Sequence, residues 1–128
     1  MRTIKFRAKN INGVWYYGCL VYSNELDAAI YFQTGNGSVN VMDWVYVNPE
    51  TVGQFTGLLD KNGNEIYEGD ILDFNRLIVE VRFVRGVFAF LVNGDLDEEL
   101  CGDCRTDLFA KVIGNVYDNS ELLKEESY

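Results

Sequence analysis

The residues whose types and spacing could support chemistry are Cys101 and Cys104, which form a C-x-x-C pair inside an acidic segment. A structural zinc site requires four ligands, and the chain has no histidine and only one further thiol, Cys19. A carboxylate, Cys19 or a second copy of the chain would have to complete such a site. Thioredoxin-like redox chemistry calls for a βαβ context, and neighbouring carboxylates raise thiol pKa values. We therefore predict no metal and no cofactor. A metal- or thiol-dependent function of Cys101 and Cys104 ranks behind the two functions, protein binding and nucleic-acid association, that are set out at the end of this subsection.

The absence of histidine also removes imidazole acid–base catalysis and the Ser-His-Asp and Cys-His nucleophile pairs within one chain. The sequence contains no Walker loop and no GxGxxG motif after a strand. Carboxylate pairs arise by chance among 20 acidic residues, and the acidic run from Asp95 to Glu99 lacks the glycine and spacing of an EF-hand. We predict a protein that is not an enzyme and has no catalytic residues.

Two features near the N-terminus could bind a partner. Residues 4–9 alternate between apolar and basic side chains, a pattern that predicts a half-buried strand, and Lys5, Arg7 and Lys9 form a basic strip with Arg2. This half is also rich in aromatic residues: Trp15, Tyr16, Tyr17, Tyr22, Tyr31, Phe32, Trp44 and Tyr46. The basic strip is either a ribbon that grips phosphate or an acidic partner, or a solvated face or a strand paired with the acidic half of the same molecule. The aromatic residues form either a stacking platform for bases or a ligand, or the filling of a small β core. Because no comparable set of Lys and Arg lies among these aromatics, we expect them to fill the core.

Alternating patterns and turn residues predict a mainly β chain with a short C-terminal helix. Asn48-Pro49 ends the N-terminal strands and marks a module boundary, Arg85-Gly86 forms a two-residue hairpin loop, and residues 93–107 are a polar loop. Asn119 or Ser120 caps the helix, which continues to Lys124. The expected strands cover residues 3–9, 14–22, 28–33, 39–47, 52–59, 66–67, 71–74, 77–84, 87–92 and 108–117.

The most distinctive stretch runs from Glu50 to Leu72 and reads ETVGQFTGLLDKNGNEIYEGDIL. It resembles the YopX family of phage and prophage proteins, and residues 4–8 and 112–119 resemble that family's opening and closing segments. Asn119-Ser120-Glu121 stands where the family often has Asn-Pro-Glu. The resemblance implies an N-terminal β-region followed by a small SH3-like β-barrel, in a phage-derived protein of unassigned function. It supplies no catalytic residues. With the boundary after Pro49, the expected modules are residues 1–49 and 50–128.

Charge is distributed unevenly along the chain. Residues 1–50 hold four basic and four acidic residues, whereas residues 51–128 hold seven basic and sixteen acidic ones, which gives the whole net charge of −9. No apolar run approaches the roughly 20 residues of a membrane span, and three cysteines fit a reducing compartment, so we expect a cytoplasmic protein of the bacterial host cell. We predict a non-enzymatic protein–protein interaction module that binds a host or phage protein or its own copies. The alternative is a nucleic-acid-associated accessory protein or an acidic DNA mimic, and the sequence singles out no binding residues.

Overall fold

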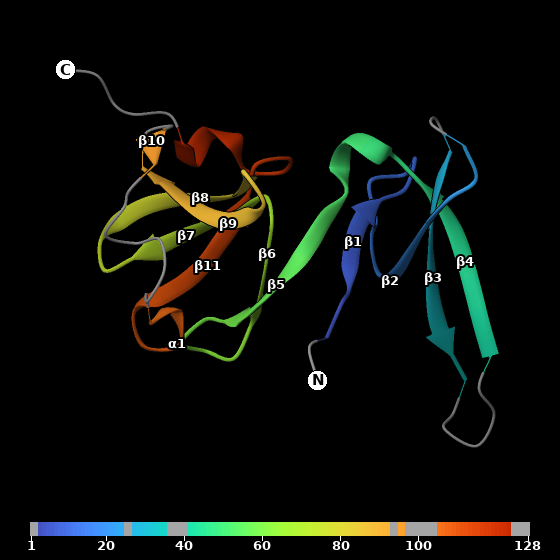
Figure 1. Cartoon of the computed structure of the whole chain (residues 1–128), viewed down its shortest axis with the longest axis horizontal. Coiled ribbons are helices and arrows are strands. Elements are labelled where there is room, and N and C mark those ends of the chain that lie inside the picture. Colours follow the sequence, from blue (N-terminus) through green and yellow to red (C-terminus); the bar gives the residue numbers. More distant parts are fainter. Residues whose placement is uncertain (1–2, 25–26, 36–40, 93–94, 97–104, 124–128) are drawn as a thin grey trace. The chain divides into compact units, whose positions relative to one another are not determined.

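The computed structural model describes residues 3–24, 27–35, 41–92, 95–96 and 105–123 (Figure 1). The chain divides into two compact units, residues 1–55 and 56–128. Strand β5 (Gly53–Leu59) runs from the first unit into the second. None of the helices in the described part of the chain has the length and hydrophobicity of a transmembrane span.

The N-terminal unit contributes β4, β3, β2, β1 and the start of β5 to an antiparallel sheet in the order β4-β3-β2-β1-β5-β6, whose last strand, β6, belongs to the C-terminal unit. The side chain of Asn10 closes the β1–β2 turn by accepting hydrogen bonds from the backbone N–H groups of Asn12 and Val14. Gly18 is required in β2, because a Cβ there would lie 2.1 Å from the carbonyl oxygen of Tyr31 on β3. The other elements of this unit are β1 (Phe6–Lys9), β2 (Trp15–Tyr22), β3 (Ala28–Thr34), β4 (Val41–Val47) and the 3-10 helix η1 (Pro49–Thr51).

The core of the N-terminal unit lies on one face of this sheet. Buried side chains there are Ala8, Ala28, Ile30 and Val47, with Phe6, Tyr16, Leu20, Phe32, Val45 and Val52 packed around them. Helix η1 is tied to β1 by Thr51, whose hydroxyl oxygen accepts from the backbone N–H of Lys9 at 2.9 Å. The other face of the sheet carries no buried cluster among the described residues, and we call it the outer face.

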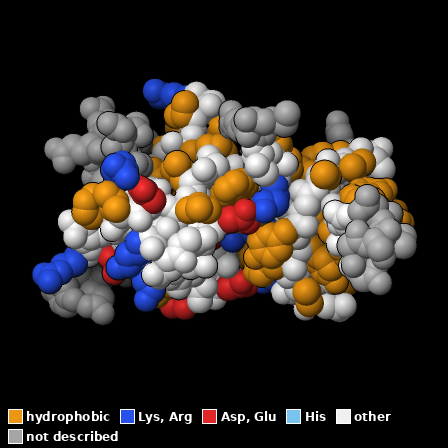
Figure 2. All heavy atoms as spheres, turned by 90° about the horizontal axis from the view of Figure 1, so that it is seen from below, with side chains coloured by type: hydrophobic (Ala, Val, Ile, Leu, Met, Phe, Trp, Pro, Cys, Tyr) orange, Lys and Arg blue, Asp and Glu red, His pale blue; other side chains and the backbone are white. Residues whose placement is uncertain are grey.

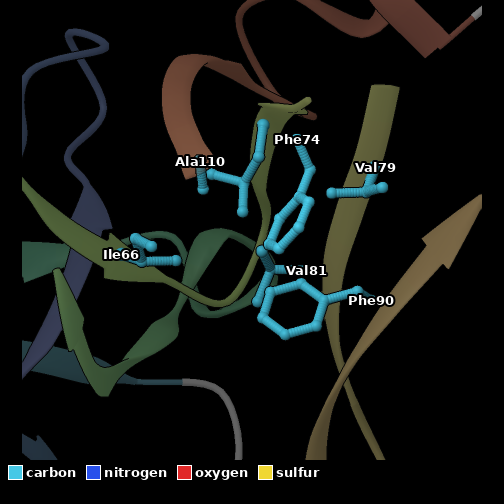
Figure 3. Close-up of a cluster of buried hydrophobic side chains, with 7 residues drawn as sticks. Ile66, Phe74, Val79, Val81, Phe90 and Ala110 are labelled. Atoms are coloured by element: carbon cyan, nitrogen blue, oxygen red, sulfur yellow. The ribbon is translucent and has the colours of Figure 1, made fainter. Parts of the chain in front are cut away.

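The C-terminal unit contains a second antiparallel sheet in the order β10-β9-β8-β7-β11. Its core gathers Ile66, Leu72, Phe74, Val79, Val81, Phe90 and Ala110 (Figure 3). The elements are β6 (Glu65–Tyr67), β7 (Asp70–Phe74), β8 (Leu77–Val84), β9 (Val87–Val92), β10 (Asp95–Leu96), α1 (Thr106–Phe109), β11 (Ala110–Asn115) and the 3-10 helix η2 (Ser120–Leu123).

The predicted mainly β class is confirmed, as is the Arg85-Gly86 loop, where both residues have positive φ. In the part of the chain that the structure describes, the second sheet ends at β10 and β11, so no closed barrel is found. The predicted short C-terminal helix is the single 3-10 turn η2, and Lys124 lies outside the described residues.

The predicted strand 108–117 is wrong at both ends. Leu108 and Phe109 belong to α1, and β11 stops at Asn115. The helical turn forms because the hydroxyl of buried Thr106 donates to the carbonyl oxygen of Leu59 at 3.0 Å, which fixes the chain before β11. The predicted polar loop 93–107 likewise contains β10 and the start of α1. A strand of two residues and one helical turn are too short to leave a periodic pattern.

Candidate binding surface

Two aspartates of the distinctive stretch from Glu50 to Leu72 hold the fold together, and the first of them is Asp60. Asp60 is 2% exposed, and its carboxylate accepts backbone N–H bonds from Asn62 at 2.9 Å, Asn64 at 2.8 Å and Val112 at 3.0 Å. Burial acts to raise the pKa of Asp60, but these N–H groups together lower it below its ordinary value. The ionised carboxylate therefore joins the Asp60–Gly63 turn to β11.

The second tight turn of this stretch, Glu68–Asp70, has the same kind of role. Buried Asp70 accepts from the backbone N–H of Tyr67 at 2.7 Å. Gly69 adopts φ 94°, and its N–H donates to the carbonyl oxygen of Val81 while its carbonyl accepts from the N–H of Val116, both at 2.8 Å. Both turns therefore connect strands, and their carboxylates are occupied by backbone donors.

The cysteine predictions concern residues in different parts of the chain. Cys101 and Cys104 lie outside the described residues, and Cys19 is an exposed thiol on β2. Among the residues that the structure describes, no three Cys, Asp or Glu side chains are grouped so that they could hold a metal ion. That the protein binds no metal and is not an enzyme stays a prediction.

The aromatic residues of the N-terminal unit contradict the prediction that they fill its core. Of the eight aromatic residues from Trp15 to Tyr46, Tyr16 and Phe32 pack against the buried cluster, with ring centroids 5.3 Å apart. Tyr17, Tyr22, Trp44 and Tyr46 are exposed, with Trp44 at 46% and Tyr46 at 61%. Neighbouring aromatics such as Tyr16 and Tyr17 must point to opposite faces of a pleated strand, so a dense run cannot enter a one-sided core. Hydrophobic side chains at the surface are visible in Figure 2.

Strand register brings four of these rings onto the outer face. Tyr31 on β3 is paired with Cys19 on β2 and with Trp44 on β4. Tyr17 lies two residues before Cys19 and Tyr46 two residues after Trp44, so both point to the same side. We call Tyr17, Tyr31, Trp44 and Tyr46 the aromatic track. The rings of Tyr31 and Trp44 are stacked at 6.1 Å and 25°, and Tyr46 meets Trp44 edge-on at 4.8 Å.

The basic strip lies on this outer face as well. Across the β1–β2 hairpin, Lys9 pairs with Trp15 and Arg7 with Tyr17. The guanidinium carbon of Arg7 lies 4.7 Å from the ring centroid of Trp15, and the ammonium of Lys9 lies 5.6 Å from it. The expectation that no basic residues accompany the aromatics is therefore wrong. The Asn12-Gly13 pair is a strong hairpin signal in the sequence, and pairing residues across a turn at Asn10–Gly13 would have revealed this.

The third cation of the strip, Lys5, precedes β1 and sits beside β5. Its ammonium lies 5.5 Å from the ring centroid of Phe55, and its carbonyl oxygen accepts from the N–H of Phe55 at 2.8 Å. Arg7 is 6% exposed, whereas Lys5 and Lys9 are half-buried. The outward-facing positions of β1 to β4 and of Gly53 and Phe55 include no Asp or Glu. The outer face therefore combines exposed rings with cations.

Comparison with known proteins agrees with the fold. The crystal structure of protein EF1440 from Enterococcus faecalis is similar over 97% of this chain and 100% of that chain, with a TM-score of 0.64 and 24% identity. A search of curated proteins finds no match. The family model described as YopX protein matches residues 5–124, nearly the whole length of the sequence. The chain therefore belongs to the YopX family.

Proposed function

We propose that this protein is a non-enzymatic protein–protein interaction module of phage origin that acts in the bacterial cytoplasm. The observation that carries the proposal is the separation of charge between the two units. Residues 1–55 hold four basic and four acidic side chains, whereas residues 56–128 hold seven basic and sixteen acidic ones. A negative charge of nine on one small unit attracts a basic protein surface and steers its approach.

The acidic side chains that the structure describes in the C-terminal unit differ in their exposure. Asp60 and Asp70 are buried and bonded to backbone N–H groups, so they serve the fold. Asp107, Asp118 and Glu121 lie at the surface of this unit, where Asp107 also accepts hydrogen bonds from Arg105. The partner that this unit fits is a protein with clustered Lys and Arg. A DNA-binding protein is one such partner, and the acidic unit would then act as a DNA mimic.

A charge-reversal pair tests this proposal. Glu121 is exposed at η2 in the C-terminal unit, and Glu50 is exposed at η1 in the N-terminal unit. Glu121→Lys and Glu50→Lys change the net charge equally, so only the position differs. With the full chain immobilised and exposed to bacterial lysate at low ionic strength, we expect a retained protein that salt elutes. We also expect Glu121→Lys to weaken its retention more than Glu50→Lys does.

Two results would count against the acidic unit as the interaction surface. One is the absence of any protein retained above a blank matrix, together with a monomeric chain by light scattering. The other is an equal loss of retention for Glu121→Lys and Glu50→Lys, which would indicate a general charge effect.

A second candidate function, association with nucleic acid, is favoured by one specific observation. The cations of β1, the exposed rings of β2 and β4 and the half-buried ring of Tyr31 on β3 share the outer face of the N-terminal unit. This combination is the one that single-strand-binding surfaces use.

A further inference from the structure

We propose that the aromatic track on the outer face of the N-terminal unit binds the bases of single-stranded nucleic acid. The inference develops the second candidate function and does not depend on the acidic C-terminal unit. It rests on three features of one sheet face: the placement of the rings, their exposure and the charge around them.

The rings cross the sheet on a diagonal. Tyr17 lies on β2, Tyr31 on β3, and Trp44 and Tyr46 on β4, with Tyr31 and Trp44 directly paired. Two strand spacings and two steps of two residues give a track roughly 16 Å long from its first Cα to its last. That length offers successive stacking positions to a few neighbouring bases, as in other single-strand-binding proteins.

The rings present accessible surface rather than core packing. Trp44 and Tyr46 are 46% and 61% exposed, and Tyr17 is also exposed. The near-parallel contact of Tyr31 with Trp44 at 25° orders both rings within the sheet surface. A base that stacks on such a ring gains contact at little cost in side-chain entropy, because the strands and the neighbouring ring already restrict each side chain.

The charge on this face is complementary to a phosphate backbone. Lys5 and Lys9 are half-buried beside Phe55 and Trp15, and the ring contacts hold both ammonium groups on the outer face. Arg7 is almost fully buried, so it positions Trp15 and adds positive potential rather than contacting a phosphate. The net charge of −9 comes from residues 56–128. It lowers the affinity of the whole chain for any polyanion.

This surface is suited to single-stranded rather than duplex nucleic acid. Bases in a duplex are stacked and paired, so flat rings on a sheet reach them only after unpairing, which costs a few kcal/mol. Flexible single strands can turn their bases toward the rings. Pyrimidine strands with little internal stacking are therefore suitable probes.

The test is a titration of the full chain into a fluorescently labelled oligothymidylate of about 12 nucleotides at low ionic strength, followed by anisotropy. We expect salt-dependent binding to which an unlabelled duplex of the same length competes poorly. Trp44→Ala should weaken binding roughly 5- to 150-fold, the range that loss of one stacking contact gives. Trp44→Phe, which keeps a ring, should restore most of the affinity.

Phe83→Ala is the matched control. Phe83 is 49% exposed and packs against Phe88 with ring centroids 5.0 Å apart, much as Trp44 packs against Tyr46, but it lies on β8 of the other unit. It should leave oligonucleotide affinity unchanged. Lys5→Gln and Lys9→Gln should each flatten the dependence of affinity on salt.

Several outcomes would overturn the inference. They are no anisotropy change at low ionic strength, equal competition by duplex, and equal effects of Trp44→Ala and Phe83→Ala. Light scattering of the same samples can give a further outcome that would overturn the inference. A self-associating chain that Trp44→Ala converts to monomer without oligonucleotide binding would assign the outer face to a second copy. A protein partner that binds this face in place of the oligonucleotide would likewise contradict the proposal.

Thermal melting of Trp44→Ala shows whether a loss of oligonucleotide binding reflects unfolding of the variant. If Trp44→Ala is unfolded, the oligonucleotide affinity of Trp44→Phe becomes the test of the proposal.

Discussion

Replacement of Asp60 is the sharpest test of whether the distinctive stretch from Glu50 to Leu72 stabilises the fold. In Asp60→Ala, the backbone N–H groups of Asn62, Asn64 and Val112 all lose their acceptor. A buried donor left without an acceptor costs about 1–3 kcal/mol. Some of this loss is recovered if water enters, so we expect the free energy of unfolding to fall by about 3–5 kcal/mol. That is a large share of the roughly 5–15 kcal/mol that stabilises a small domain.

Asp60→Asn gives a finer prediction because the two carboxylate oxygens have different partners. Oδ1 accepts from the N–H groups of Asn62 and Asn64, and Oδ2 accepts from Val112 N–H and the side-chain amide of Asn64. An amide keeps one oxygen, so its NH2 group faces a backbone donor in either orientation. We expect a loss of about 2–4 kcal/mol from one unsatisfied N–H and weaker remaining bonds.

Urea unfolding followed by far-ultraviolet circular dichroism measures these losses. Hydrogen exchange of the Val112 amide then shows whether the damage lies at β11. Asp107→Asn is the control, because the pKa of Asp107 is also lowered, by its hydrogen bond with Arg105, but Asp107 is exposed. It should change stability far less. Wild-type stability and Val112 protection in Asp60→Asn would refute the structural role of this carboxylate.

The same residue predicts the sign of a pH effect. The pKa of Asp60 in the folded chain lies below its ordinary value of 3.8, because the backbone N–H groups outweigh the effect of burial. Its contribution to stability is therefore complete above that value and is lost as the pH falls through the lower folded pKa. Asp60→Asn should remove this part of the acid destabilisation.

Three further predictions concern the backbone. Gly18→Ala should destabilise the N-terminal unit by about 3 kcal/mol or more, because its Cβ meets a main-chain oxygen that cannot rotate away; the test is a melt followed by tryptophan fluorescence, since both tryptophans lie in residues 1–55. Gly114→Ala should cost less, because its Cβ meets side-chain atoms of Asn119 at 2.6 to 2.9 Å rather than a main-chain oxygen at 2.1 Å. The Asn119 side chain has to shift and give up its bond from Asn115 N–H, and a cost above that of Gly18→Ala would contradict the reasoning. Arg76→Gly should stabilise the C-terminal unit by about 1 kcal/mol by relieving φ 79°; a lower urea midpoint would show that the Arg76 side chain matters more than the backbone.

Much of the fold is readable from local signals. The Asn10–Gly13 turn, the Asp60–Gly63 turn and the Arg85-Gly86 loop each place turn residues between alternating runs, and the strands follow. Helix α1 is invisible to such reasoning, because one helical turn depends on a long-range bond from Thr106 to Leu59. The closure of a sheet into a barrel is likewise a long-range property that turn chemistry does not report.

The candidate surface was harder to predict because it depends on which face of each strand is buried. Alternation shows that Tyr16 and Tyr17 point to opposite sides, but it does not show which side meets the core. Register across β2, β3 and β4 was needed to bring Tyr31 beside Trp44. The placement of Lys9 opposite Trp15 was accessible from the sequence, because a short predicted turn joins their strands.

The most direct test of the binding face is a nuclear magnetic resonance titration of the isotopically labelled full chain with a short oligothymidylate. The indole N–H signals of Trp15 and Trp44 report on the two ends of the face that combines cations and rings. We predict that both signals move during the titration, Trp44 the more strongly, together with amides of β2, β3 and β4, while the amides around Phe83 stay in place. Shifts confined to the C-terminal unit, or no shifts at low ionic strength, would contradict the account.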